Sequence, residues 1–155
     1  MSEITLDAAS LRLLAALQKD SRLTLQELAD AVGLSATPCW RRMKALEESG
    51  VIRGYTALVD REKVGLHLCV VAQVSLAHHV EGAAAAFERA METAPEVIEC
   101  YRTTGDADYI VKVVVADTRA YDRFLQDKIF TLSVISNIRS NIALREVKYQ
   151  TALPL

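Results

Sequence analysis

The chain has 155 residues, which is enough for one ordinary domain or two small ones. A hydrophobic share of 51%, a charged share of 25% and only three prolines exclude an intrinsically disordered chain. The formal net charge of -2 argues against a uniformly basic nucleic-acid binder, so any DNA-binding surface must be a local patch.

The N-terminus reads MSEITLDAAS and has neither the basic nor the apolar region of a signal peptide. No apolar run reaches the roughly 20 residues that a membrane span needs. We therefore expect a cytoplasmic protein that does not engage a membrane. The cysteines are odd in number and widely spaced, which favours reduced thiols over disulfides or a zinc site, and the histidines lack a third ligand, so we expect no metal. These residues are Cys39, Cys69, Cys100, His67, His78 and His79.

Helical periodicity runs through the first fifty residues and predicts three short helices joined by tight turns. They span about 7–20, 24–33 and 35–50. The second begins with the T-x-x-E spacing of a capping box, formed by Thr24 and Glu27. A compact three-helix unit is therefore expected over residues 1–55.

The segment 25–44 contains a helix, a turn with glycine, and a second helix with small polar residues at its start and cations on its flank, as a major-groove reader requires. Hydroxyls and free amides at the helix start suit phosphates or base edges, whereas Arg42 and Lys44 suit phosphates. Two alternatives remain, namely a protein-binding module with a solvated basic flank and a core position for Trp40. The candidate DNA-binding residues are Ser35, Ala36, Thr37, Pro38, Trp40, Arg41, Arg42 and Lys44.

After residue 55 the pattern changes to a linker or hinge over 56–65 and then to alternating strands and helices. The order βαββαβ predicts a ferredoxin-like, ACT-like αβ-sandwich over 66–155, so the fold class is α+β. The expected strands are 66–76, 97–104, 109–115 and 138–149. The expected helical stripes are Val80, Ala83, Ala84, Phe87 and Met91, then Tyr121, Phe124, Leu125 and Ile129.

Two amphipathic helices can cover only one face of a four-stranded sheet. The strands LHLCVVAQV and YIVKVVV are expected to be apolar on both faces. Because a long exposed apolar sheet invites aggregation, the second face is expected to be covered by the same sheet of another chain, which gives a two-fold dimer.

The chain as a whole resembles the Lrp/AsnC family, the leucine-responsive or feast/famine bacterial regulators. The resemblance is carried by LQKDSRLTLQELADAVGLSATPCWRRMKALEESGVIRGYTALVD, by TGDADYIVKVVV and by REVKYQTALPL. The ending looks most like the regulators of branched-chain keto-acid catabolism. The resemblance implies a DNA-binding regulator of amino-acid metabolism genes with its recognition helix at 35–49. It also implies a small effector, usually an amino acid, at a subunit interface and assembly of dimers into octamers, that is, tetramers of dimers.

The expected effector site centres on Gly105, where the backbone can approach a ligand closely. Amides beside Gly105 can meet a carboxylate, and Asp106 and Asp108 can accept bonds from an ammonium group. The alternative is an ordinary hairpin turn. A second wall is expected from 131–137, where TLSVISN replaces the Pro-Gly turn of many relatives. The candidate effector-binding residues are Tyr101, Thr103, Thr104, Gly105, Asp106, Asp108, Thr131, Ser133, Ser136 and Asn137.

The two rival functions are an enzyme and a stand-alone amino-acid sensor. An enzyme could use Asp106 and Asp108 as an acid/base pair or metal clamp, but no nucleophile-base motif, phosphate loop or metal signature accompanies them. A stand-alone amino-acid sensor without DNA binding would leave the basic helix unexplained. We therefore expect no catalytic residues, no cofactor other than the effector, and two kinds of partner: double-stranded DNA and further copies of the chain.

Overall fold

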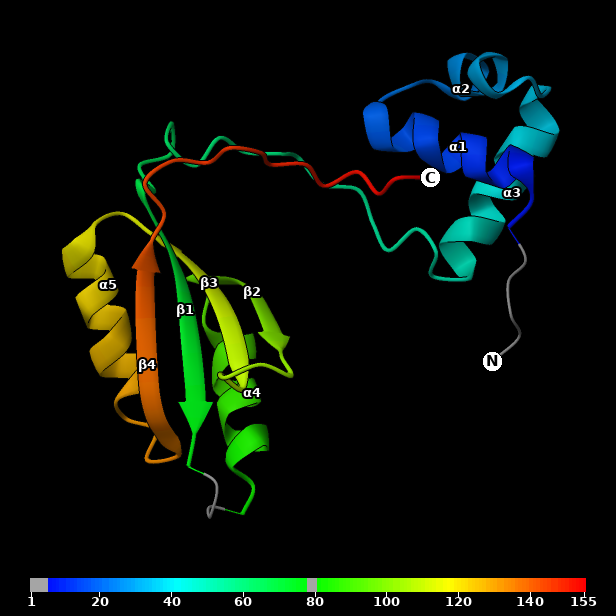
Figure 1. Ribbon diagram of the computed structural model, residues 1–155. Coiled ribbons are helices and arrows are strands. Elements are labelled where there is room, and N and C mark those ends of the chain that lie inside the picture. The colour runs from blue at the N-terminus through cyan, green and yellow to red at the C-terminus, as the bar shows by residue number, and fades with distance from the viewer. Residues whose placement is uncertain (1–5, 78–80) are drawn as a thin grey trace. The chain divides into compact units, whose positions relative to one another are not determined.

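The computed structural model describes residues 6–77 and 81–155 (Figure 1). These form two compact units, one of residues up to Leu58 together with Lys148–Leu155, and the other of Val59–Val147. The tail 148–155 was assigned to the second domain from the sequence, but the structure packs it with the first. The predictions for His78, His79 and Val80 lie outside the described residues. In the described part of the chain, no helix is long and apolar enough to cross a membrane.

The first unit is built on three helices, which confirms the prediction made from the helical periodicity of the sequence. Their inner faces meet in one apolar cluster whose most buried members, Leu13, Leu28, Ala29 and Cys39, are at most 1% exposed. Burying such side chains is the main favourable term in a unit of this size. The helices are α1 (Ala8–Lys19), α2 (Leu25–Val32) and α3 (Ala36–Glu48).

Local capping sets the helix boundaries. The carboxylate of Asp7 accepts a hydrogen bond from the amide of Ser10 at 2.8 Å and so starts α1. Thr24 and Glu27 form the predicted capping box at the start of α2. Gly33 ends that helix in the left-handed region, with φ 71°, a conformation that costs glycine little.

The second unit is a four-stranded antiparallel sheet with the strand order β2-β3-β1-β4. This order and the βαββαβ succession confirm the ferredoxin-like fold. The second helix of the unit ends in a π-helical turn, η1. The elements are β1 (Leu68–Leu76), α4 (Ala83–Thr93), β2 (Val97–Arg102), β3 (Tyr109–Val115), α5 (Thr118–Phe124), η1 (Leu125–Ile129) and β4 (Ile135–Ile142).

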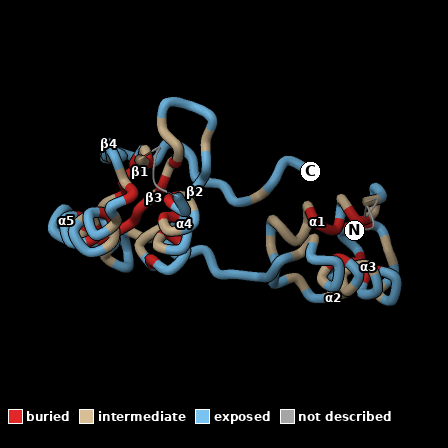
Figure 2. Tube along the Cα trace, turned by 90° about the horizontal axis from the view of Figure 1, so that it is seen from below, coloured by how far each residue is buried: buried red, intermediate tan, exposed pale blue. Residues whose placement is uncertain are grey.

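The helices α4 and α5 lie on one face of this sheet, and the buried residues gather between the two layers (Figure 2). Phe87 of α4 is fully buried, and its ring centroid lies 4.6 Å from that of Tyr109 on β3. Tyr121, Phe124 and Ile129 contribute the corresponding face of α5 and η1. The described residues of the predicted helical stripes therefore do form or pack against the core.

The open face of the sheet is less apolar than predicted. The strand register places Tyr101, Ile110, Gln73 and Arg139 in one row across the four strands. Alternate residues of β1 and β3 face this way, so polar side chains are interleaved with the valines and isoleucines. The prediction that both faces are apolar is correct for some positions only, Val71, Ile110 and Val114 among them.

The last strand was predicted over 138–149 but runs from Ile135 to Ile142. Its partner β1 explains the difference, because Ile142 pairs with Val70 near the start of β1. The amide of Ala143 still donates to the carbonyl of Cys69 at 2.9 Å, and beyond it no strand remains for pairing. A β-like sequence without a neighbouring strand therefore continues as irregular chain.

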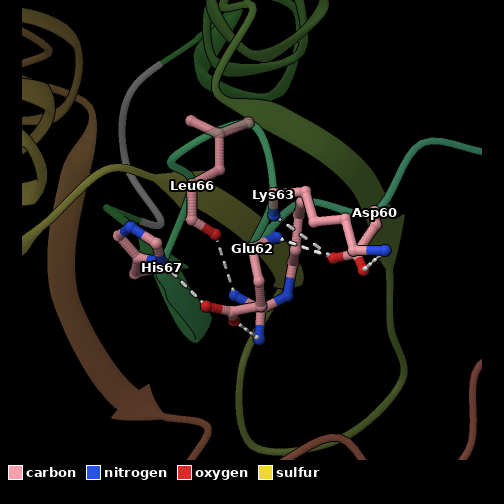
Figure 3. A network of polar contacts seen from close by, with 6 residues as sticks. Asp60, Glu62, Lys63, Leu66 and His67 are labelled. Atoms are coloured by element: carbon pink, nitrogen blue, oxygen red, sulfur yellow. Dashed lines mark hydrogen bonds and ion pairs between the residues drawn. The ribbon is translucent and has the colours of Figure 1, made fainter.

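The predicted hinge contains an ordered turn at the start of the second unit (Figure 3). The carboxylate of Asp60 accepts from the amides of Glu62 and Lys63 at 3.0 and 3.4 Å. The carboxylate of Glu62 lies 2.8 Å from Nδ1 of His67, just before β1. These local contacts fix the path of the chain into the sheet.

Candidate functional site

The start of α3 has hydrogen-bonding groups that the fold leaves unused. Ser35 occupies the N-cap position, but its hydroxyl makes no capping hydrogen bond. The first amides of a helix have no intrahelical acceptor, and they carry the positive end of the helix dipole. Thr37 is exposed within this first turn, and Pro38 has no amide that would need a partner. This end of α3 is therefore suited to bind phosphate or the edge of a base.

Trp40 and Arg41 lie on the outside of α3. Cys39 is fully buried in the helical core, whereas the neighbouring Trp40 is 48% exposed. The alternative that Trp40 belongs to the core is therefore wrong. Arg41 is exposed and makes no ion pair or hydrogen bond within the described part of the chain. An aromatic ring and a free guanidinium thus stand next to each other on the solvent side.

Arg42 has a structural partner that the sequence did not reveal. One nitrogen of its guanidinium lies 2.8 and 2.7 Å from the two carboxylate oxygens of Asp7, and 3.3 Å from the hydroxyl of Ser10. This contact ties the middle of α3 to the start of α1. The hydrogen bond from the Ser10 amide, together with Arg42, lowers the pKa of Asp7 to about 2.

The depressed pKa of Asp7 predicts a pH dependence of stability. A carboxylate whose folded pKa lies below its unfolded value stabilises the fold above about pH 4, and this contribution is lost as the pH falls through about 2. The variant Asp7→Asn can still cap α1 but cannot titrate. Urea unfolding at a series of pH values should show a smaller loss of stability between pH 4 and 2 for Asp7→Asn than for the wild type. Equal losses of stability in the two proteins would contradict a lowered pKa of Asp7 in the folded state.

Lys44 is also engaged. Its ammonium lies 2.6 Å from the carboxylate of Glu47, which in turn accepts a hydrogen bond from the hydroxyl of Tyr55 at 3.0 Å. The contact with Lys44 lowers the pKa of Glu47, and the same contact raises the pKa of Lys44. Of the three cations predicted to bind DNA, Arg41 alone lacks a carboxylate partner among the described residues.

The two loops of the predicted effector site lie at the same end of the sheet. Tyr109, which follows the first loop, pairs with Val74 near the end of β1, and Ile135, which follows the second loop, pairs with Leu76. The fold therefore brings together segments that are about thirty residues apart in the sequence. Tyr101 lies on β2, Thr103, Thr104, Gly105, Asp106 and Asp108 lie between β2 and β3, Thr131 and Ser133 precede β4, and Ser136 and Asn137 lie on β4.

Asp108 and Ser136 converge on the end of β1, where the pairing with β4 has an irregularity at Ser75 and Leu76. The carboxylate of Asp108 accepts from the amide of Leu76 at 2.7 Å. The hydroxyl of Ser136 lies 3.0 and 3.2 Å from the carbonyl oxygens of Ser75 and Leu76, to which it can donate. Both side chains therefore hold the backbone of β1, a role that sequence reasoning missed.

Asp106 differs from Asp108 because its exposed carboxylate has no partner in the described chain. The hydroxyl of Thr103 donates to the carbonyl of Ala107, and the backbone amide of Thr103 donates to the carbonyl of Asp108. These two hydrogen bonds close the loop between β2 and β3. A side chain at Gly105 would meet no atom within 4 Å, and Gly105 does not have a positive φ. The turn geometry therefore does not require glycine, and the space beside its backbone is open.

Two cavities lie elsewhere in the second unit, with volumes of about 370 and 330 Å³. Neither is lined by any of the predicted effector-binding residues. In the described residues, no group of three or more histidine, cysteine, aspartate or glutamate residues could hold a metal ion.

A helix-turn-helix with an exposed, partly cationic second helix, joined to a separate ferredoxin-like unit, defines a DNA-binding regulator with its own ligand domain. Residues 6–53 match the winged helix-turn-helix DNA-binding family, and residues 69–153 match the Lrp/AsnC ligand binding domain. The chain belongs to the Lrp/AsnC family of transcription regulators. This confirms the resemblance seen in the sequence.

Similar proteins extend over nearly the whole chain. The Bkd operon transcriptional regulator of Pseudomonas aeruginosa is 41% identical over 150 residues, which cover 97% of this chain and 98% of that protein. The DNA-binding transcriptional activator DecR of Escherichia coli is 39% identical over 150 residues, or 97% and 99% of the two chains. A transcriptional regulator from Neisseria meningitidis, solved in complex with L-Met, superposes with a TM-score of 0.91 at 35% identity and 97% coverage of both chains. These relatives are regulators and not enzymes, which rules out the acid/base alternative for Asp106 and Asp108.

Proposed function

We propose that this chain regulates genes of amino-acid metabolism. An amino acid binds at the end of the sheet where the loop between β2 and β3 and the loop before β4 lie, and it changes the affinity of the protein for the operator. The observation that supports operator reading most directly is the exposed start of α3. There Ser35, Thr37, Trp40 and Arg41 present donors and an aromatic face that no other described residue of the helical unit uses.

The chemistry of the loop supports a zwitterionic ligand. An α-amino acid needs donors for its carboxylate and an acceptor for its ammonium group. The open backbone around Gly105 can supply amides, and the unpartnered carboxylate of Asp106 can accept from the ammonium. The exposed hydroxyls of Thr104 and Ser133 add further polar groups at this end of the sheet. The solved complex of the Neisseria relative with L-Met supports the same class of ligand.

A gel-shift assay tests both parts of the proposal. The full-length protein is titrated against DNA from the region upstream of its own gene, first alone and then with each of the twenty amino acids. We expect a specific shift in the absence of ligand and a changed affinity with at least one amino acid. No shift at moderate salt, with random DNA as the control, would refute operator binding.

We further propose that the open face of the sheet forms a two-fold dimer interface and that dimers assemble into a tetramer of dimers. Val71 and Ile110 supply partly exposed apolar area on the two central strands, and Tyr101 supplies an exposed ring at the β2 edge. A two-fold axis packs the same face of two chains together, so each apolar residue contributes to the interface once from each chain.

The variant Val71→Lys should weaken this dimer by roughly tenfold or more, because it places an unpaired charge on each side of the interface. Sedimentation equilibrium at micromolar concentration measures the change. Leu144→Lys is the matched control, since Leu144 is 97% exposed and lies beyond the sheet. A wild type that sediments as a monomer, or equal dimerisation of Val71→Lys and the wild type, would refute the interface.

A further inference from the structure

The larger of the two cavities, of about 370 Å³, lies at the end of the sheet opposite to the loops of the expected effector site. Val115, which lines it, ends β3 and pairs with Leu68 at the start of β1. Tyr109, beside the first of those loops, begins β3 and pairs with Val74 near the other end of β1. The length of β3 therefore separates the two places by about 20 Å.

The wall of this cavity contains a carboxylate oxygen without a partner. The amide of Val114 donates to the backbone carbonyl of Glu96 at 2.9 Å, which fixes Glu96 beside the end of β3. Oε2 of Glu96 is buried, and it is the one such side-chain oxygen or nitrogen without a hydrogen bond in the partly or fully buried residues that the structure describes. A buried acceptor of this kind is unfavourable unless a donor reaches it. The terminal torsion of glutamate is broad, so a rotation turns this oxygen toward the cavity.

The cavity also presents two cations that nothing else engages in the described part of the chain. Arg123 of α5 and Lys128 of η1 both line it, and neither has an ion pair or a hydrogen bond with another described residue. With Glu96 and Asp127 they form a lining of two positive and two negative charges. Such a lining matches a molecule that carries one charge of each sign, whereas a dication or a dianion would meet repulsion there.

The remaining wall is apolar and includes a rare turn of helix. Val115 and Phe124 are buried and supply a surface on which an aliphatic stem can lie. Beside them, the amide of Phe130 donates to the carbonyl of Leu125 at 2.8 Å, the bond that closes the π-helical turn η1. Turns of this type occur frequently at functional sites. A few charged groups above an apolar floor, in a cavity of this volume, are typical of small-molecule sites.

We propose that this cavity is a second small-molecule site, which binds a small zwitterion with its ammonium group on Glu96 and its carboxylate at Arg123 and Lys128. It shares no residue with the expected effector site. The proposal does not depend on operator binding, and a ligand can occupy either site alone.

Methyl NMR of the full-length protein, labelled at alanine, separates the two sites in one titration. Ala116 and Ala120 line the cavity, whereas Ala107 lies in the loop between β2 and β3. Each of the twenty amino acids is added up to millimolar concentration, and at least one should shift the Ala120 signal in a saturable way. If none of them shifts Ala116 or Ala120, the cavity is not an amino-acid site. If Ala120 responds and Ala107 never does, this site stands and the expected effector site fails.

Glu96→Gln removes the charge with little change of shape. It should weaken binding at Ala120 roughly ten- to hundredfold, since a charged hydrogen bond is lost, and leave any response of Ala107 unchanged. Glu92→Gln is the matched control, because Glu92 is exposed on α4 and does not line this cavity. Equal affinity in Glu96→Gln and the wild type would refute the site, because the shift would then be relayed from elsewhere.

Two further measurements test the roles of the charges. Without ligand, Glu96→Gln should unfold at the same urea concentration as the wild type or at a higher one, since it loses an unpaired carboxylate. A lower concentration would mean that Glu96 is already paired within the chain, which contradicts the proposal. The tightest amino acid is also compared with the acid that lacks its amino group, and we expect the acid to bind at least tenfold more weakly. Equal binding of the two would rule out Glu96 as the partner of an ammonium group.

Discussion

Replacement of Arg41 by Ala should weaken operator binding by about 1 to 3 kcal/mol, roughly five- to hundredfold, if its guanidinium reads a base. The structure gives the reason, because Arg41 is exposed on α3 and has no protein partner in the described chain. Nothing in the fold should need the side chain, so the free energy of unfolding should stay unchanged. Fluorescence anisotropy with labelled operator measures the loss.

Arg42→Ala is the informative control. If Arg42 held a phosphate, its removal would lower the salt dependence of binding by about one unit. Because its guanidinium is paired with Asp7 and Ser10, we expect an unchanged slope and a less stable helical unit instead. If Arg41→Ala binds the operator as tightly as the wild type, Arg41 does not read a base, and α3 is not the recognition helix.

The helices and the order of the strands could be predicted because they depend on local signals. Periodic apolar residues, the Thr24 and Glu27 capping box, and the glycine that ends α2 all act within a few residues of each other. Such signals are readable along the chain. The βαββαβ succession then leaves few topologies, and the ferredoxin-like order is the one observed.

The contacts that could not be predicted join residues that are distant in sequence. Arg42 and Asp7 are 35 positions apart, and Asp108 and Leu76 are 32 apart, so no local pattern marks either pair. The end of β4 depends on where β1 begins, and strand propensity beyond Ile142 has no effect without a neighbour. The attachment of the tail to Gln18 was missed for the same reason.

The two aspartates of the TGDAD segment should have separable effects. Asp106→Ala should lower the affinity for the amino-acid ligand roughly ten- to hundredfold, because a charged hydrogen bond to an ammonium group contributes about 1.5 to 3 kcal/mol. The Asp106 carboxylate has no other partner in the described residues, so stability should not change. Asp108→Ala should instead lower the free energy of unfolding by about 1 to 3 kcal/mol, because it leaves the part-buried amide of Leu76 without its acceptor.

Two measurements separate these effects. Calorimetry with the amino acid that alters the gel shift measures the ligand affinity. Urea unfolding, followed by circular dichroism, measures the free energy of unfolding. Operator binding without ligand should survive in Asp106→Ala, but the ligand-dependent change should be lost, since linkage requires the ligand to bind the two states differently. If ligand affinity is the same in Asp106→Ala and the wild type, the ammonium is bound elsewhere. If Asp108→Ala unfolds at the same urea concentration as the wild type, the bond from Leu76 to Asp108 contributes nothing to the end of β1, and Asp108 becomes the better candidate for the ligand.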